Sequence, residues 1–508
     1  MTSTTPEYAD VEKGSATTLS HQPHSEIPAE KTTTTPHDPH EVFLSPEEDP
    51  KVLPLWRRWL AASIVILGAI CVTGSSSIAA TVETGVSEYL HVSNEVSTLS
   101  VTLFVLGMGV GPMVIGPLAG ILGQRVIYIF SFVFLFAFNF PVEFSHSLAV
   151  HLVFRFLGGL AGSAFLSLGG ATISDLFNDE EVGTPMAAFT IGTFVGPVIT
   201  PVWGGFVYQR AGWRWAYHVF TIWEFVQTLL LIIGVPETNV QVIVRRKAVR
   251  LRKTSGDNRY YAAVEREDRG SVFKDIGTRA LKIVELTFYD RMILLLDIWC
   301  SLVLGILYLV FQVFPIIFAG KHHFDSEQVG LAFIGVLVGL AIAMASQYWW
   351  NKFRRHIAEK YTCDAPPEVW LTMGKLGGIL VPISLYCLAF TTYAHVHRIA
   401  PIISTIPFGT GMCYIFTSTF TYLTVAYRHL AAEALTSNAV MRTLFAGAFP
   451  LFSTAMYNRL GTDGATALLA GLMTVMAPLP FVFARVGERL RAKSAYAYKS
   501  SPTPLTDS

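Results

Sequence analysis

The sequence predicts an all-α membrane protein with twelve transmembrane helices in two six-helix halves, and three observations lead to this prediction. Hydrophobic residues make up 52% of the chain and charged residues only 15%, with a mean hydropathy of +0.45. Apolar stretches long enough to cross roughly 30 Å of hydrocarbon recur about every thirty residues, as expected of spans joined by short loops. A single long polar interval divides these stretches into two equal sets.

The apolar stretches set the expected spans. In chain order they are Arg58–Thr81, Val96–Leu118, Val126–Phe144, Leu148–Thr172, Pro185–Tyr208, Trp215–Val235, Met292–Phe318, Val329–Trp350, Thr372–Tyr393, Ile399–Tyr427, Ala434–Met456 and Ala465–Ala484.

The remaining segments complete the predicted domain organisation. Residues 1–55, rich in Thr, Ser, Pro, Glu and His and without an apolar signal-peptide core, are expected to form a disordered cytosolic tail. Residues 56–235 and 290–491 form the helical halves, 236–289 form a basic amphipathic cytosolic linker, and 492–508 form a second cytosolic tail. The formal net charge of +0 gives no reason to expect nucleic acid as a partner.

The distribution of Lys and Arg predicts the orientation, because positively charged loops close to span ends stay in the cytosol. With both termini inside, the linker and most other basic loop residues fall on the cytosolic side. The loop from Val82 to Glu95 has three glutamates and no Lys or Arg. The exceptions, which fall outside, are Arg210, Arg214, Lys321, Arg398 and Arg459.

Small residues recur in the first half at spacings that allow close helix packing. Each pair of glycines four residues apart is, by itself, typical of ordinary helix packing. The order of the glycine-containing motifs along the chain is a more specific signal of a protein family. The series is Gly116-Pro-Leu-Ala-Gly-Ile-Leu-Gly-Gln-Arg125, Arg155-Phe-Leu-Gly-Gly-Leu-Ala-Gly162, Gly192-Thr-Phe-Val-Gly196-Pro197-Val-Ile-Thr-Pro-Val-Trp-Gly204-Gly205, Gly212-Trp-Arg-Trp215 and Val235-Pro-Glu-Thr238.

In this order the motifs resemble those of the major facilitator superfamily, and within it the fungal twelve-span drug:proton antiporters. The resemblance runs from about Trp56 to Arg491. It implies the major facilitator fold, proton-coupled transport by alternating access, and a role for Arg155 in proton coupling. It also implies that the signature residues of the fifth helix favour export, namely Gly192, Gly196, Pro197, Gly204 and Gly205.

Three positions depart from the family pattern. Gly120 stands where an acidic or small polar residue is usual, Thr200 stands where glycine is usual, and Gln312 stands where many relatives carry glutamate. Without that carboxylate, a cationic substrate such as a polyamine is less favoured.

Ionisable residues within spans are costly and are therefore functional candidates. Arg155, Glu224 and Asp297 are the candidates for proton coupling, because a carboxylate in a low-dielectric medium favours its neutral form and can load and release a proton. The alternatives are a snorkelling arginine near the outer face for Arg155, and structural partners of polar neighbours for the two carboxylates.

Two further groups complete the candidate sites. Arg125 and Asp175 fall on the cytosolic side, where a pair could latch one conformation; a plain helix-end charge is the alternative for Asp175. Gln312, Phe311, Tyr308 and Tyr414 are candidates to line the substrate cavity. The cysteines have neither metal-ligand nor disulfide spacing, and no cofactor is expected.

The favoured function is export of a small organic molecule, such as a secondary metabolite, an organic acid or a drug, driven by protons. A polyamine or nutrient transporter is the alternative. A membrane-embedded enzyme is disfavoured because the histidines lie in tails, loops and span ends. A nucleotide-driven pump is disfavoured because the sequence has no GxxxxGK(S/T) phosphate-binding loop. We expect a monomer in the plasma membrane, with the vacuolar membrane as the alternative, and partners limited to lipid, protons and the small-molecule substrate.

Overall fold

The protein is described by a computed structural model, which covers residues 40–178, 181–266, 272–358, 366–393, 395–494 and 496–497. Most of the predicted N-terminal tail and of the C-terminal tail lies outside this range. The described chain is helical throughout, apart from turns and one isolated bridge between Glu41 and Tyr261. Eleven of its segments are long and apolar enough to cross a membrane.

The last of these segments, Ala431–Ala492, has 62 residues, or about 90 Å of helix, which is enough for two crossings. It turns back at Gly461, whose backbone has φ 73° and ψ 167°, values outside the helical region that glycine adopts without steric cost. The apolar segments therefore provide the twelve predicted crossings.

The first half consists of six spans and a short connecting helix. The fourth span is divided by Ser163 into two consecutive helices. The bounds are α1 Leu55–Thr81, α2 Glu83–Leu90, α3 Asn94–Leu122, α4 Gln124–Phe144, α5 Leu148–Gly162, α6 Ala164–Leu176, α7 Gly183–Ala211 and α8 Trp213–Gly234.

The second half repeats the six-span arrangement with more interruptions. Its elements are α12 Arg291–Phe314, a π-helical turn Pro315–Ala319, α13 Gly320–His322, α14 Ser326–Leu331, α15 Ile334–Ala358, a 3-10 turn Pro367–Leu371, α16 Thr372–Thr391, α17 Ile399–Ser404, α18 Ile406–Ala426, α19 Ala431–Met476 and α20 Leu479–Lys493.

The linker between the halves is helical as well. It contains α9 Val240–Ser255, α10 Ala263–Arg266 and α11 Val272–Tyr289. The last of these packs against α3 of the first half and against α12 and α19 of the second. The linker helix α11 therefore packs against both halves.

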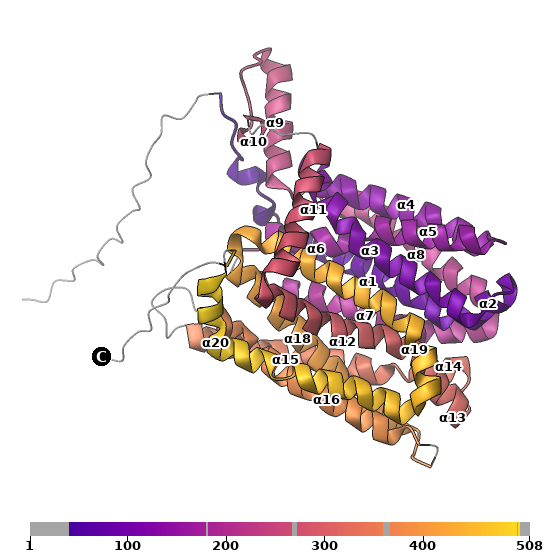
Figure 1. Ribbon diagram of the computed structural model, residues 1–508. Coiled ribbons are helices and arrows are strands. Elements are labelled where there is room, and N and C mark those ends of the chain that lie inside the picture. Colours follow the sequence, from indigo (N-terminus) through magenta and orange to yellow (C-terminus); the bar gives the residue numbers. More distant parts are fainter. Residues whose placement is uncertain are drawn as a thin grey trace, which may run out of the picture.

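The two ends of the bundle are distinct in Figure 1. The linker helices lie at one end together with α20, and we call this the linker end; α2, α13 and α14 lie at the opposite end, here called the far end. The start of the described chain also lies at the linker end, where Lys247 contacts Glu48 at 2.7 Å and Val42 bonds to Tyr261. Both ends of the described chain thus lie on the same side as the linker.

The halves touch along three lines, namely α3 with α19, α7 with α14 and α15, and α1 with α12. At the far end Arg210 of α7 donates to Glu327 of α14, with 2.7 Å between Nε and Oε1. Nearby, the backbones of Pro201 and Gly330 approach so closely that a side chain on Gly330 would collide with the Pro201 carbonyl. The far end is therefore closed in this conformation.

Candidate functional site

Arg155 lies inside the first half and not at its surface. Its side chain projects from α5 between α1 and α3, and the residue is only 2% exposed. The guanidinium donates to two backbone carbonyls, that of Ser100 at 3.2 Å and that of Ser76 at 3.4 Å, and lies 4.3 Å from the ring centre of Phe104. Burial to this degree does not fit the snorkelling alternative, because a snorkelling arginine keeps its charged end in water.

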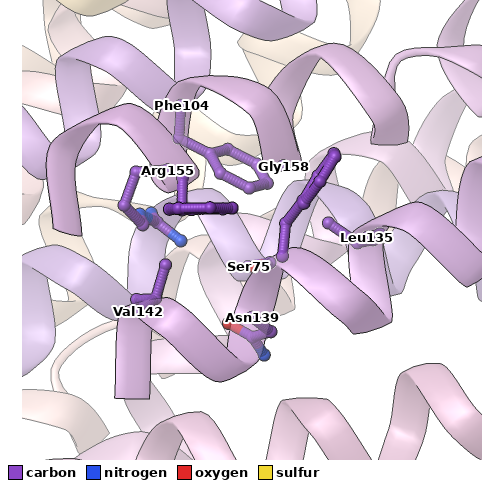
Figure 2. A pocket seen from close by; sticks show the side chains of 9 residues that line it. Ser75, Phe104, Leu135, Asn139, Val142, Arg155 and Gly158 are labelled. Atoms are coloured by element: carbon purple, nitrogen blue, oxygen red, sulfur yellow. The ribbon is translucent and has the colours of Figure 1, made fainter. Parts of the chain in front are cut away.

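A small cavity adjoins Arg155 within the first half (Figure 2). Its volume is about 10 Å³, room for about one water molecule. Asn139 of α4 and Ser75 of α1 line it beside Arg155, and the other walls are apolar. The cavity is enclosed by α1, α3, α4 and α5 of the first half.

Glu224 lies close to this region on α8 and is completely buried. One of its oxygens accepts a hydrogen bond from Asn139 Nδ2 at 3.4 Å, and the other has no partner. Asn139 also donates to Thr221 at 2.9 Å, one turn away on α8. Glu224 is therefore an incompletely satisfied carboxyl group in the same half as Arg155.

Asp297 occupies a different environment in the second half. It is also completely buried, on α12, but both of its oxygens accept short hydrogen bonds, from Ser437 Oγ at 2.6 Å and from Asn438 Nδ2 at 2.8 Å. These bonds hold α12 against α19. The three residues predicted for proton coupling thus do not form one cluster, and the contacts of Asp297 match the structural alternative.

Arg125 and Asp175 do not form an ion pair in this conformation. Asp175 accepts a hydrogen bond from the Gln124 side chain at 2.9 Å, whereas Arg125 donates to the Ile232 carbonyl at 2.6 Å. The turn at Gly123, with φ 98°, starts α4 so that Gln124 faces inward, and the next residue is rotated by about 100° around the helix toward the end of α8. Gln124 therefore takes the place that we predicted for Arg125.

The signature residues of the fifth helix serve two contacts. A Cβ on Gly196 would lie 2.5 Å from the Ile70 carbonyl, and one on Gly192 would lie 2.9 Å from the Ile66 side chain, so both allow α7 to approach α1. Gly204 faces Ile78 of α1 in the same way. Gly205 differs, because it lies against the Ser326 backbone of the second half, and Pro197 is buried within α7.

The four predicted cavity residues divide between the interface and the second half. The hydroxyl of Tyr308 on α12 lies 2.6 Å from that of Ser76 on α1, and so spans the contact between the halves. Gln312, one turn further along, is 9% exposed, and its side chain lies beside Glu83 of the first half. Phe311 packs on Phe333, with ring centres 5.3 Å apart, within the second half.

Tyr414, the fourth predicted cavity residue, lies inside the second half. Its hydroxyl lies 2.7 Å from Ser346 of α15, and its ring packs on Trp350. All three residues belong to the second half. The sequence could not fix the direction of this ring, because Ser and Thr residues occur on several sides of α18 and no single polar face marks the side toward a cavity.

Sequence reasoning missed a second arginine within a span. Arg442 of α19 donates to the Asn438 carbonyl at 3.3 Å, and its guanidinium lies 4.8 Å from the ring centre of Phe420 and 5.4 Å from that of Phe416. Phe416 in turn stacks on Phe194 of the first half, at 4.5 Å. The sequence did contain a signal for Arg442, because a charged residue inside an apolar span is a functional candidate by default.

Glu83 was also missed, since it follows the first span by only two residues. It is 9% exposed at the far end and accepts a hydrogen bond from Thr98 at 2.6 Å. Burial raises its pKa to about 7, although the Thr98 and Gln312 side chains partly oppose this shift.

Over the part of the chain that the structure describes, no three His, Cys, Asp or Glu side chains gather in an arrangement that could hold a metal ion.

A two-half bundle of membrane-spanning helices with buried charges beside the contact between its halves defines the class of secondary transporters. The sequence profile of the Major Facilitator Superfamily matches residues 64–450, and the chain belongs to this family.

Relatives of known sequence extend over most of the chain. It is 34% identical to the probable drug/proton antiporter YHK8 of Saccharomyces cerevisiae, over 90% of this chain and 89% of that one. It is 39% identical to the efflux pump atB of Aspergillus terreus, over 77% and 83% of the two chains. With the multidrug transporter mdrA of Aspergillus fumigatus the identity is 33%, over 92% and 78%.

Solved structures support the fold. The human organic anion transporter MFSD10 aligns with a TM-score of 0.59 over 84% of this chain and 100% of that one, at 15% identity. A D-xylose-proton symporter aligns with the same TM-score over 84% and 97%, at 14% identity. At these identities the likeness concerns the fold alone.

Proposed function

We propose that the chain is a proton-driven exporter of small organic molecules that works by alternating access and exchanges substrate for protons. The observation that carries this proposal is Arg155, a buried cation held by backbone carbonyls, with no carboxylate hydrogen-bonded to it. A charge of this kind inside a membrane is costly unless it serves transport. The relatives named as drug/proton antiporter and efflux pumps support the direction of transport.

The charges beside the interface favour neutral or anionic substrates. Arg442 carries a positive charge near the contact between the halves, and Gln312 offers a neutral amide where a glutamate would attract a cation. A cationic substrate would have to be desolvated close to the positive charge of Arg442, which is unfavourable in a low-dielectric site. Organic acids and uncharged metabolites are therefore favoured over polyamines, which remain the alternative substrate class.

The arrangement of the ends supports a cytosolic linker and cytosolic termini. The basic helix α9, the start of the described chain and α20 lie together at the linker end, and basic segments close to spans stay in the cytosol. The closed far end then faces outward, and breaking the Arg210–Glu327 pair accompanies outward opening. We place the protein in the plasma membrane, acting as a monomer and leaving its substrate chemically unchanged.

Transport assays test this function. The full chain is expressed in yeast cells that lack their own efflux pumps, and these cells are loaded with the anionic dye carboxyfluorescein or with the cation ethidium. Faster loss of carboxyfluorescein than in empty-vector cells, abolished by a protonophore, is the expected result. Accumulation of dye inside expressing cells would contradict export, and unchanged efflux in the presence of the protonophore would contradict proton coupling.

Polyamine transport is tested separately by growth on toxic concentrations of spermine. Protection by the native chain comparable to its effect on carboxyfluorescein would favour the alternative substrate class. An inactive variant, Arg155→Ala, controls for effects of expression alone in both assays.

A further inference from the structure

A continuous row of polar side chains crosses part of the first half between α4 and α8. His218 Nδ1 lies 2.8 Å from Glu143 Oε2, and the other oxygen of Glu143 accepts a hydrogen bond from the Thr221 hydroxyl. Asn139 joins Thr221 to Glu224, at 2.9 and 3.4 Å. The row therefore runs from His218 near the far end of α8 to Glu224 about two turns deeper.

The two carboxyl groups in this row are both buried, Glu143 with 1% exposure and Glu224 with none. Neither is hydrogen-bonded to a lysine or an arginine, and one oxygen of Glu224 has no partner at all. Two negative charges in one buried network repel each other and are poorly solvated, so the pair is most stable when it holds a proton. A shared, exchangeable proton is the simplest state of this pair.

The groups around the pair allow this proton to respond to the transport cycle. Arg155 is the cation whose field reaches Glu224, and it lines the small cavity together with Asn139. That cavity has room for about one water molecule, which could bridge the row to Arg155 (Figure 2). The titratable and charged groups that face the pair are Arg155 and His151 on α5, Tyr217 and His218 on α8, and Cys71 on α1.

The row also reaches the protein surface at only one of its ends. The His218 side chain is 28% exposed, whereas Thr221, Asn139 and Glu224 are buried. His218 lies within the first two turns of α8, directly after the far-end turn at Gly212. With the linker in the cytosol, as proposed above, His218 opens to the outside.

We propose that the coupling proton enters from the outer face through His218 and is stored on the Glu143 and Glu224 pair, behind Arg155 and apart from the contact between the halves. This inference rests on the proposed proton coupling. Protonated His218 gives its Nδ1 proton to Glu143, which leaves a neutral imidazole and a carboxylic acid. The proton then moves by way of the Thr221 hydroxyl to Glu224, and Glu143 returns to its carboxylate form.

Storage at this place separates the proton from the substrate. Tyr308 and Gln312 lie at the contact between the halves, whereas the pair lies between α4 and α8. Proton and substrate therefore do not compete for one binding group, and they influence each other through Arg155, which contacts α1 and α3 by way of Ser76 and Ser100.

Infrared difference spectroscopy tests the storage site without any substrate. The purified full chain in lipid nanodiscs is compared at acidic and alkaline pH, and a carboxylic-acid C=O band that shifts in heavy water is expected. Glu224→Gln and Glu143→Gln, which keep the shape of each side chain, should each remove or displace this band. Glu95→Gln, at an exposed glutamate in the first turn of α3, is the matched control and should leave the band unchanged.

A pH step applied to one side tests the entry route. In vesicles with the chain in a known orientation, a step on the outer side should protonate the pair several times more slowly in His218→Gln than in the native chain, while a step on the linker side gives equal rates. His146→Gln, at an exposed histidine of the same outer face, should behave as native. Equal outer-side rates in His218→Gln and native would overturn the route.

The two tests separate this inference from the proposed function. If neither glutamine variant removes or displaces any pH-dependent carboxyl band of the native chain, storage on the pair is overturned, even if efflux is proton-driven. If the glutamine variants lose the band as expected but the protonophore does not reduce efflux, the proton-storage site is supported. In that case the proposed coupling of transport to protons is contradicted.

Discussion

Two buried carboxyl groups, one in each half of the bundle, are hydrogen-bonded to different degrees. In the second half, both oxygens of Asp297 are hydrogen-bonded, and Glu368 receives two bonds from Arg491, at 2.8 and 3.1 Å. In the first half, Glu224 has an unpaired oxygen, whereas the buried arginines Arg155 and Arg442, one in each half, are both held by backbone carbonyls and aromatic rings. A fully satisfied network fixes one arrangement, whereas an incompletely satisfied one can exchange a proton or a partner. The comparison suggests that the first half carries the proton and the second half provides a firmer frame.

The largest expected effect is at Arg155. Arg155→Lys keeps a positive charge but loses the planar set of donors that reaches the Ser100 and Ser76 carbonyls together. We expect almost complete loss of proton-driven efflux in both Arg155→Lys and Arg155→Ala, measured in vesicles with an imposed pH gradient. Normal insertion and thermal stability of both variants would show that the loss concerns function. Native efflux in the lysine variant would reduce Arg155 to a packing residue.

Paired neutral substitutions test the contrast between the halves directly. Glu224→Gln should flatten the pH dependence of efflux, because the stored proton is lost. Asp297→Asn should keep the pH dependence but destabilise the fold by about 1–3 kcal/mol, since the amide accepts from only one of the two donors, Ser437 and Asn438, and places an NH2 group against the other. Efflux against pH and thermal unfolding are measured for both variants. The opposite pattern would exchange the roles of the two halves.

A smaller effect is expected at the interface, where Gln312→Glu introduces a carboxylate beside Tyr308. We expect the preference for carboxyfluorescein over ethidium to fall by about tenfold, which corresponds to about 1.4 kcal/mol. Gln312→Asn is the neutral control and should keep the native preference. An unchanged ratio in Gln312→Glu would mean that this side chain does not face the substrate.

The smallest effect on transport is expected at Glu83, where pH acts on stability. Burial raises the pKa of Glu83 from 4.5 to about 7, so the folded chain binds this proton more tightly than the unfolded chain. The linkage therefore predicts that stability falls as pH rises from 4.5 through about 7. Glu83→Gln should remove this part of the decrease in melting temperature, measured across that range, while Glu88→Gln should not. A native slope in Glu83→Gln would assign the pH dependence to another group.

Much of the architecture could be predicted from the sequence because a span reveals itself by length and hydropathy alone. The twelve expected spans agree with the helices, and the polar linker forms helices of its own. The division of the fourth span at Ser163 and the loopless turn at Gly461 were not foreseen, because each depends on a single backbone conformation that local composition does not signal.

The site was less predictable, because the direction of a side chain depends on helix rotation. The sequence correctly placed Arg125 and Asp175 at the same end of the bundle. It could not determine which of the two adjacent residues, Gln124 or Arg125, faces inward. Glu143 was overlooked for a related reason: it lies in the last turn of its span, where a charge normally reaches water. The fold turns it toward Thr221 instead.

The bridging position of α11 has a consequence for engineering the protein. Its Thr287 hydroxyl lies 2.7 Å from that of Ser437, which in turn donates to Asp297, so this helix is part of the second half's buried polar network. By contrast, α9 ends at Gly256 in a left-handed cap, followed by an exposed turn at Asn258 and Arg259. A fluorescent domain inserted after Gly256 would extend from an exposed turn and should leave the fold intact. The same insertion within α11 would disturb the Thr287–Ser437–Asp297 hydrogen bonds of the second half.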